Sequence, residues 1–150
     1  MKKILIPVDG SEASLKAAKE AVSIGKMINA ELTFLTVVNL PTEDKYSYFG
    51  IAVENAFIAN RKTMLKTLIH EETRMLNILV ENLDSGGLKV DQKIIIGKAN
   101  EEIVKLAKEG NFDFIVIGRR GFSNIERFFI GSVTQKVLAE SPCPVMVINV

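Results

Sequence analysis

The sequence has no excess of either charge and almost no cysteine. Its 150 residues include 19 basic and 18 acidic side chains, which give a formal net charge of +1. This balance gives no reason to expect a nucleic acid or an anionic membrane as the main partner. The single cysteine, Cys143, excludes an internal disulfide and is typical of a protein from a reducing compartment.

Long apolar runs are also missing. The basic start of the chain leads into a short apolar run that stops at Pro7 and Asp9, too soon for the core of a signal peptide. No other run approaches the length of a transmembrane helix. Because hydrophobic residues still make up 47% of the chain, the composition predicts a folded protein rather than a disordered one. We expect a soluble, cytoplasmic protein with a single domain over residues 1–150.

Strand and helix patterns alternate along the chain. Apolar and β-branched runs predict strands at residues 4–8, 31–38, 89–97 and 112–118 and within 142–150. Apolar residues at helical spacing predict helices over about 12–29, 58–83, 100–110 and 131–140. This alternation predicts an α/β fold, with a mostly parallel sheet covered by helices on both faces.

Local signals fix some of the element ends. Ser11 and Asn100 are predicted to cap the first and third helices. Pro7 argues against a central strand unless it lies at the C-terminal end, where pairing stops. Residues 39–57 fit neither period, so we interpret them as a long connection, and we expect residues 41–57 to be the most mobile part of the free protein. Such a segment could close over a ligand or meet a partner.

Two strands end in residues that could face a ligand. In open parallel sheets, ligands bind beyond the C-terminal ends of the strands. The first strand ends at Asp9 and the fourth at Gly118. Gly118 and Gly121 could adopt positive φ and let the backbone approach a ligand closely. Gly131 opens a helix whose free amides and dipole favour an anion.

Polar residues around these glycines strengthen the case for a phosphate site. Ser132 and Thr134 would add hydroxyl donors, and Arg119, Arg120 and Arg127 make the intervening loop basic. Against this, glycine is ordinary at strand-to-helix turns, and Ser132 with Gln135 fits a capping box that would satisfy the helix amides internally. The better-known phosphate motifs GxxxxGK[ST] and GxGxxG are absent. The spacing alone leaves both interpretations open.

The segment GRRGFSNIERFFIGS, with the pattern Gly-x2-Gly-x9-Gly-Ser, resembles the ATP-binding signature of the universal stress protein family. The likeness extends to KKILIPVDGSEAS, LTFLTVVN, GKANEEIVKLAKEGNFDFIVIG and GSVTQKVLAESPCPVMVI, so only about residues 41–85 fall outside it. It implies a single-domain, Rossmann-like fold with an open, parallel, five-stranded sheet in the order 3-2-1-4-5. All the signature glycines are present, which favours the ATP-binding branch of the family.

The resemblance also implies which residues bind ATP. Asp9 would lie by the adenine and ribose, Val37 would offer backbone contacts to the adenine, and Gly118 would lie near the ribose. Pro7, Val8 and Ile117 would line the nucleoside pocket. The phosphates would be held by Gly121, Gly131, Ser132, Val133 and Thr134. Gly97 is a weaker candidate. Mg²⁺ or Mn²⁺ could arrive with the nucleotide, held by phosphates and water.

By the same resemblance, we expect a regulatory or stress-response protein that binds ATP as a homodimer. Two copies would pair through the C-terminal strand, about Val145 to Val150, and an unknown protein partner would respond to the complex. At most slow hydrolysis is expected, because no candidate base for activating water is found. His70 and Cys143 are expected to be packed or solvated rather than reactive, and no cluster has metal-ligand spacing.

Two alternatives belong to other classes. One is an enzyme that hydrolyses ATP or transfers a nucleotidyl group, in which the loop arginines would stabilise phosphate charge. The other is a phospho-receiver domain. That chemistry needs an acidic cluster around a phosphorylatable aspartate, whereas here the first strand offers one aspartate and the third strand ends at Gly97.

Overall fold

The computed structural model describes residues 1–39, 51–121 and 130–150, with the backbone alone for 51–59. The strands are β1 (Lys3–Pro7), β2 (Glu31–Val38), β3 (Val90–Ile96), β4 (Phe114–Gly118) and β5 (Val145–Ile148). The helices between them are α1 (Glu12–Ile28), α2 (Ile51–Glu81), α3 (Ala99–Glu109) and α4 (Ser132–Glu140). The strands form one parallel sheet in the order β3-β2-β1-β4-β5, which confirms the expected topology.

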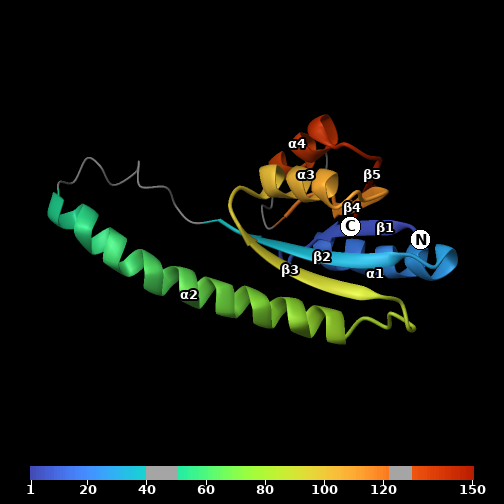
Figure 1. Cartoon of the computed structure of the whole chain (residues 1–150), viewed down its shortest axis with the longest axis horizontal. Coiled ribbons are helices and arrows are strands. Elements are labelled where there is room, and N and C mark those ends of the chain that lie inside the picture. The colour runs from blue at the N-terminus through green and yellow to red at the C-terminus, as the bar shows by residue number, and fades with distance from the viewer. Residues whose placement is uncertain (40–50, 122–129) are drawn as a thin grey trace.

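The sheet separates two hydrophobic clusters. Helices α1 and α2 cover one face, and α3 and α4 cover the other (Figure 1). Because successive side chains of a strand point to opposite faces, the central strand β1 contributes to both clusters. Ile4 and Ile6 pack with α1 and α2, whereas Leu5 packs with α3 and α4, and all three are fully buried. Burial on both faces explains why β1 is a continuous apolar run.

Helix α1 has defined signals at both ends. Ser11 is its N-cap, as predicted, and the Ser11 side chain accepts a hydrogen bond from the Ser14 amide at 3.2 Å. Asn29 ends the helix in the left-handed conformation, with φ of 53°. Small residues form the buried face, and a β-carbon on Gly25 would lie 2.9 Å from Leu32 Cδ2. The helix therefore packs closely on the sheet because its buried face is nearly flat.

Helix α2 starts earlier than its apolar pattern predicts. It begins at Ile51 rather than near residue 58, so the predicted connection is wrong over residues 51–57, and residues 41–50 lie outside the described part of the chain. Once a helix has formed, each added residue gains one hydrogen bond, and no glycine or proline interrupts α2. The helix can thus extend beyond the residues that pack.

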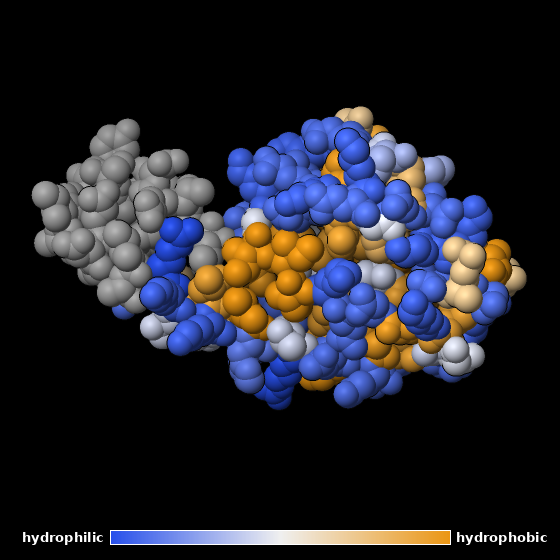
Figure 2. Space-filling model, viewed as in Figure 1, coloured by the Kyte–Doolittle hydropathy of each residue, from blue (hydrophilic) through white to orange (hydrophobic). Residues whose placement is uncertain are grey.

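The packed part of α2 is its C-terminal end. The side chains that reach the core there are Met75, Leu76, Leu79, Val80 and Leu83, the last just after the helix. The opposite end of α2 projects beyond the sheet (Figure 1). The face shown in Figure 2 has apolar as well as polar surface. The exposed large apolar side chains of the protein include Met64, Ile78 and Ile96.

Helix α3 begins one residue before the predicted start. Its N-cap is Lys98, with no hydrogen bond from the side chain, so the predicted Asn100 cap is wrong. Only Gly97 and Lys98 separate β3 from α3. Gly97 makes the turn with φ of 156°, and the helix then starts at once.

No helix in the described residues is long and apolar enough to cross a membrane.

Pro7 lies at the C-terminal end of β1, as predicted, and its missing N–H faces β4. The Val8 amide donates to Leu35 O of β2 at 2.8 Å, whereas Lys3 O accepts from the Asp113 amide just before β4 at 2.9 Å. The backbone N–H and C=O groups of the odd-numbered residues of β1 therefore point toward β4. The pairing of β1 with β4 stops at Leu5, while its pairing with β2 continues to Pro7. The ladder between β1 and β4 is thus interrupted toward their C-terminal ends.

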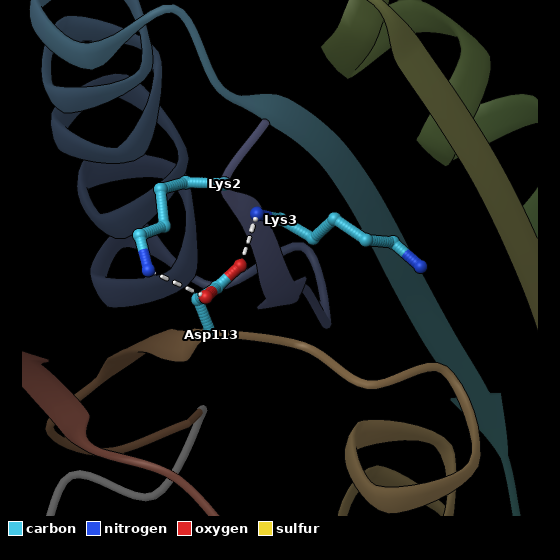
Figure 3. A network of polar contacts seen from close by, with 3 residues as sticks. All are labelled: Lys2, Lys3 and Asp113. Carbon is cyan, nitrogen blue, oxygen red and sulfur yellow. Dashed lines mark hydrogen bonds and ion pairs between the residues drawn. The ribbon is translucent and has the colours of Figure 1, made fainter.

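The start of β1 is tied to the start of β4 through Asp113 (Figure 3). The Asp113 carboxylate accepts a hydrogen bond from Lys2 Nζ at 2.9 Å and another from the Lys3 amide at 2.8 Å. The Lys2 bond, and then the Lys3 amide, lower the pKa of Asp113 below its ordinary value of 3.8. Asp113 thereby joins the central strand β1 to its neighbour β4 at the N-terminal ends of both strands.

Asp113→Asn should reduce stability at neutral pH and have less effect in acid. A carboxyl group with a lowered pKa stabilises the fold fully above its unfolded pKa, and this contribution is lost as the pH falls through the lowered folded pKa. Thermal unfolding of the parent and the variant between pH 7 and pH 2 should show midpoints that converge below the ordinary value of 3.8. A constant difference over that range would contradict the role of the charge.

Candidate functional site

A cavity lies at the C-terminal ends of β1 and β4. Its volume is about 240 Å³, just under the range of about 300–1,000 Å³ usual for small-molecule sites. The structure brings together around it every residue expected from the resemblance: Pro7, Val8, Asp9, Val37, Ile117, Gly118, Gly121, Gly131, Ser132, Val133 and Thr134. The weaker candidate, Gly97, is not among the lining residues. The cavity therefore gathers one set of residues from widely separated segments.

One side of the cavity is apolar. The sequence pattern missed part of this wall, which consists of Leu35, Ala99 and Ile103. Leu35 and Ile103 looked like ordinary core residues, and both do belong to the cluster between the sheet and α3. Leu35 lies on β2, and Ala99 and Ile103 lie in the first turns of α3, which begins soon after β3 ends. The wall suits a flat, apolar group of a ligand.

Asp9 is exposed, and the start of α1 fixes its carboxylate. The Ser11 amide donates to Asp9 Oδ1 at 2.9 Å, and the Asp9 amide donates to Ser14 Oγ at 3.3 Å. A β-carbon on Gly121 would lie 2.7 Å from Asp9 Oδ2. The other carboxylate oxygen therefore faces Gly121, where the missing side chain leaves room for it.

Helix α2 brings a second carboxylate, Glu72, into the field of Asp9. Burial raises the pKa of Glu72, and the negative charge of Asp9 raises it further. No local signal predicts this pair, because Glu72 lies on a long helix far from Asp9 in the chain. The repulsion between the two carboxylates disfavours the charged form of Glu72, which does not itself line the cavity.

The expectation of positive φ at Gly118 and Gly121 is wrong. Among the described glycines, positive φ occurs only at Gly10, Gly86, Gly87 and Gly97. A β-carbon on Gly118 would lie 2.8 Å from the carbonyl carbon of Ala13 and 2.9 Å from its oxygen. Gly118 is therefore required because the end of β4 packs directly on the first turn of α1.

The first turn of α4 leaves backbone amides free of intrahelical partners. Gly131 is the N-cap, and the first helical bond runs from the Gln135 amide to Gly131 O at 2.9 Å. The capping-box alternative is wrong, because Ser132 is already inside the helix and Gln135 Nε2 donates to Ile130 O at 2.9 Å. The amides of Ser132, Val133 and Thr134 thus precede the helical bonding pattern, at the positive end of the helix dipole.

The two hydroxyl groups of this turn differ. Ser132 is exposed, whereas Thr134 is buried and its Oγ1 donates to Gly118 O at 2.8 Å. The expectation that the Thr134 hydroxyl serves as a donor to phosphate is therefore wrong in this geometry. Arg120 lines the cavity, Arg119 is half-buried beside it, and Arg127 lies outside the described residues.

Candidate metal ligands do not gather in the part of the chain that is described. No group of three or more His, Cys, Asp or Glu side chains there could hold a metal ion. His70 is exposed on α2, and Cys143 is half-buried, with its amide donating to Ser141 Oγ at 3.2 Å. Neither residue lines the cavity.

These features define an α/β protein with a cavity at the point where the strand order reverses. The model of the universal stress protein family matches residues 1–149. The chain therefore belongs to the universal stress protein family.

Relatives match over nearly the full chain. Universal stress protein MJ0531 of Methanocaldococcus jannaschii is 33% identical, covering 99% of this chain and 82% of its own length. Universal stress protein MJ0577 of the same organism is 34% identical, covering 99% and 94%. The solved MJ0577 structure superposes with a TM-score of 0.74 over 99% of this chain and 96% of that one, at 31% identity. A universal stress protein crystallised in complex with cAMP shares the fold, with a TM-score of 0.71, 23% identity and coverage of 98% and 96%.

Gly118→Ala should destabilise the protein, whereas Gly121→Ala should not. The new methyl group at position 118 would meet the backbone of Ala13, which cannot move without α1, and such overpacking costs about 1–3 kcal/mol. At position 121 it would meet only the end of the Asp9 side chain. Denaturant unfolding of the two variants measures the difference, and equal midpoints would show that β4 and α1 are not tightly packed here.

Proposed function

We propose that this chain binds ATP in the cavity and acts as a regulatory or stress-response protein. The observation that carries the proposal is that one cavity has an apolar wall on one side and the free amides of the α4 N-terminus on another. A nucleotide has the matching asymmetry, since its base is flat and largely apolar and its phosphates are anionic. The Gly-x2-Gly-x9-Gly-Ser spacing between Gly118 and Ser132 supports the same ligand.

Each part of the cavity has a role in this proposal. The adenine lies against the apolar wall, near the Val37 backbone, and Asp9 Oδ2 accepts a hydrogen bond from the ribose. The amides of Ser132 and Val133 donate to the phosphates, where the helix dipole adds to the attraction. Arg120 supplies positive charge to the same region. A divalent cation would be held by phosphates and water rather than by a protein cage.

Several observations favour binding over turnover. Among the described lining residues, Asp9 is the only carboxylate, and its Oδ1 is already held by the Ser11 amide. Asp9 also lies on the side assigned to the ribose rather than to the phosphates.

A protein of similar fold was crystallised in complex with cAMP. This complex supports an adenine nucleotide as the class of ligand.

Isothermal titration with ATP tests the proposal. The parent protein should bind ATP, and Gly121→Val should bind at least about tenfold more weakly, because the new side chain occupies the space facing Asp9 Oδ2 and displaces the close contacts of the ligand. Ser132→Ala serves as the milder comparison and should lose less, since the backbone amides remain. Thermal unfolding of both variants should stay near that of the parent.

The result that overturns the proposal is a parent protein that gives no binding heat with ATP. Before titration, a sample of the purified protein is denatured and its supernatant is run on a nucleotide column. This control shows whether nucleotide carried through purification already fills the site, which would suppress the binding heat. ATP binding by Gly121→Val equal to that of the parent would place the ligand elsewhere.

We also propose that two copies form a homodimer through β5. This strand is the edge of the sheet in the described residues, next to β4 only. Val147 packs against the core, whereas Met146 is 43% exposed and Val150 is 56% exposed. An apolar edge strand is a template for pairing, and a two-fold axis would let β5 pair with its own copy.

Met146→Lys should weaken this dimer without unfolding the protomer. The side chain is exposed, so a lysine there avoids a buried charge while placing like charges at the interface. Val147→Lys would be ambiguous because Val147 also packs on the core. Sedimentation at micromolar concentrations should show a dimer for the parent and a shift toward monomer for Met146→Lys. A monomeric parent would refute the pairing.

A further inference from the structure

The first turn of α4 is tied to the end of β4 by two hydrogen bonds. The Gly131 amide donates to Arg119 O at 2.8 Å, and Thr134 Oγ1 donates to Gly118 O at 2.8 Å. The acceptors are consecutive carbonyl groups, and the donors belong to the N-cap and the first turn of the helix. The two ends of the segment between Arg119 and Gly131 are therefore held together by a backbone hydrogen bond.

The anchor on the β4 side is rigid. The Arg119 amide donates to Ile148 O of β5 at 2.9 Å, which keeps this end of β4 within the sheet. Gly118 is buried, and its Cα lies so close to Ala13 that no side chain would fit. Thr134 is only 3% exposed, so its hydrogen bond is shielded from competing water. The position of the helix end is thus set by contacts to a fixed strand.

We propose that Thr134 is a positioning residue for the phosphates. Its hydroxyl has one donor, which is used on Gly118 O, so its effect on a ligand runs through the placement of α4. It holds the helix end at the orientation in which the amides of Ser132 and Val133 face the cavity. This inference rests on the proposed ATP binding, and it reassigns Thr134 from a group that touches phosphate with its hydroxyl to one that aims other donors.

The geometry gives this role a specific signature. The apolar wall for the base comes from β2, α3 and β4, and the ribose contact comes from Asp9 after β1. Thr134 does bond to Gly118 O at the end of β4, but β4 is held in the sheet by its pairing with β1 and β5, so loss of the hydroxyl leaves these elements in place. Loss of the hydroxyl should therefore weaken the binding of a phosphorylated ligand and leave the binding of adenosine nearly unchanged.

Three variants separate positioning from general stability. Thr134→Val removes the hydroxyl and keeps the shape, and Thr134→Ser keeps the hydroxyl. Thr36→Val is the matched control, because Thr36 is also buried and its Oγ1 donates to a backbone carbonyl, Val8 O, at 2.9 Å. The control loses the same kind of bond at a neighbouring strand end without touching α4.

Titration with ATP and with adenosine gives the first readout. Thr134→Val should weaken ATP binding about tenfold, the effect of one misplaced charge-assisted hydrogen bond, with adenosine affinity within about twofold of the parent. Thr134→Ser should restore ATP binding, and Thr36→Val should leave the ratio of the two affinities unchanged. Equal losses for ATP and adenosine in Thr134→Val, or a Thr134→Ser variant as weak as Thr134→Val, would overturn the positioning role.

Hydrogen exchange without nucleotide gives a readout that does not depend on ATP binding. The Gly131 amide, protected by Arg119 O, should exchange at least about tenfold faster in Thr134→Val than in Thr36→Val or Thr134→Ser. If the parent binds no ATP but this acceleration is seen, the proposed function fails while the anchoring of α4 stands. Unchanged exchange in Thr134→Val would refute the anchoring itself.

Discussion

The arrangement of the protein depends on the burial of β1 on both faces. Ile4 and Ile6 contact one helical layer and Leu5 contacts the other, so neither layer can be removed without exposing the central strand. Burial of this kind contributes roughly 1.5–3 kcal/mol per large side chain. Pro7, at the C-terminal end of the same strand, interrupts its pairing with β4, and the cavity lies at these strand ends. The site thus lies at the end of the strand on which the core is built.

Most of the fold could be predicted from the sequence because strong periodic signals survive in it. The run at 31–38 coincides with β2, and Ser11 caps α1 as its position indicates. The start of α2 could not be predicted, because helix propagation beyond the packed turns leaves no apolar stripe. The Asn100 cap failed for a different reason. Where a cap lies depends on how abruptly the preceding strand ends, and β3 leaves only Gly97 and Lys98 before the helix.

Most of the residues that line the cavity were predicted from the resemblance to the universal stress protein family, but the role of each residue was not. A glycine can be required for its dihedral angles or for its missing β-carbon, and the sequence does not distinguish the two. Gly118 needs the missing β-carbon because its backbone lies against Ala13, whereas Gly97 adopts a positive φ. Likewise, the bond from Thr134 to Gly118 O links residues of two elements and has no local sequence signal. The apolar wall from α3 was hidden because Ile103 has the pattern of any core residue.

The parity of Pro7 has a consequence for how this sequence can vary in length. Its side of the strand is set by counting residues from Lys3, and odd positions face β4. A deletion or insertion of one residue between them would turn Pro7 toward β2, because side-chain and hydrogen-bonding directions alternate with a period of two. The gap in the ladder would then move to the pairing with β2, and the separation from β4 would close. Apolar substitutions at Ile4, Leu5 or Ile6 leave the direction of Pro7 unchanged, whereas a single-residue change of length relocates the gap in the ladder.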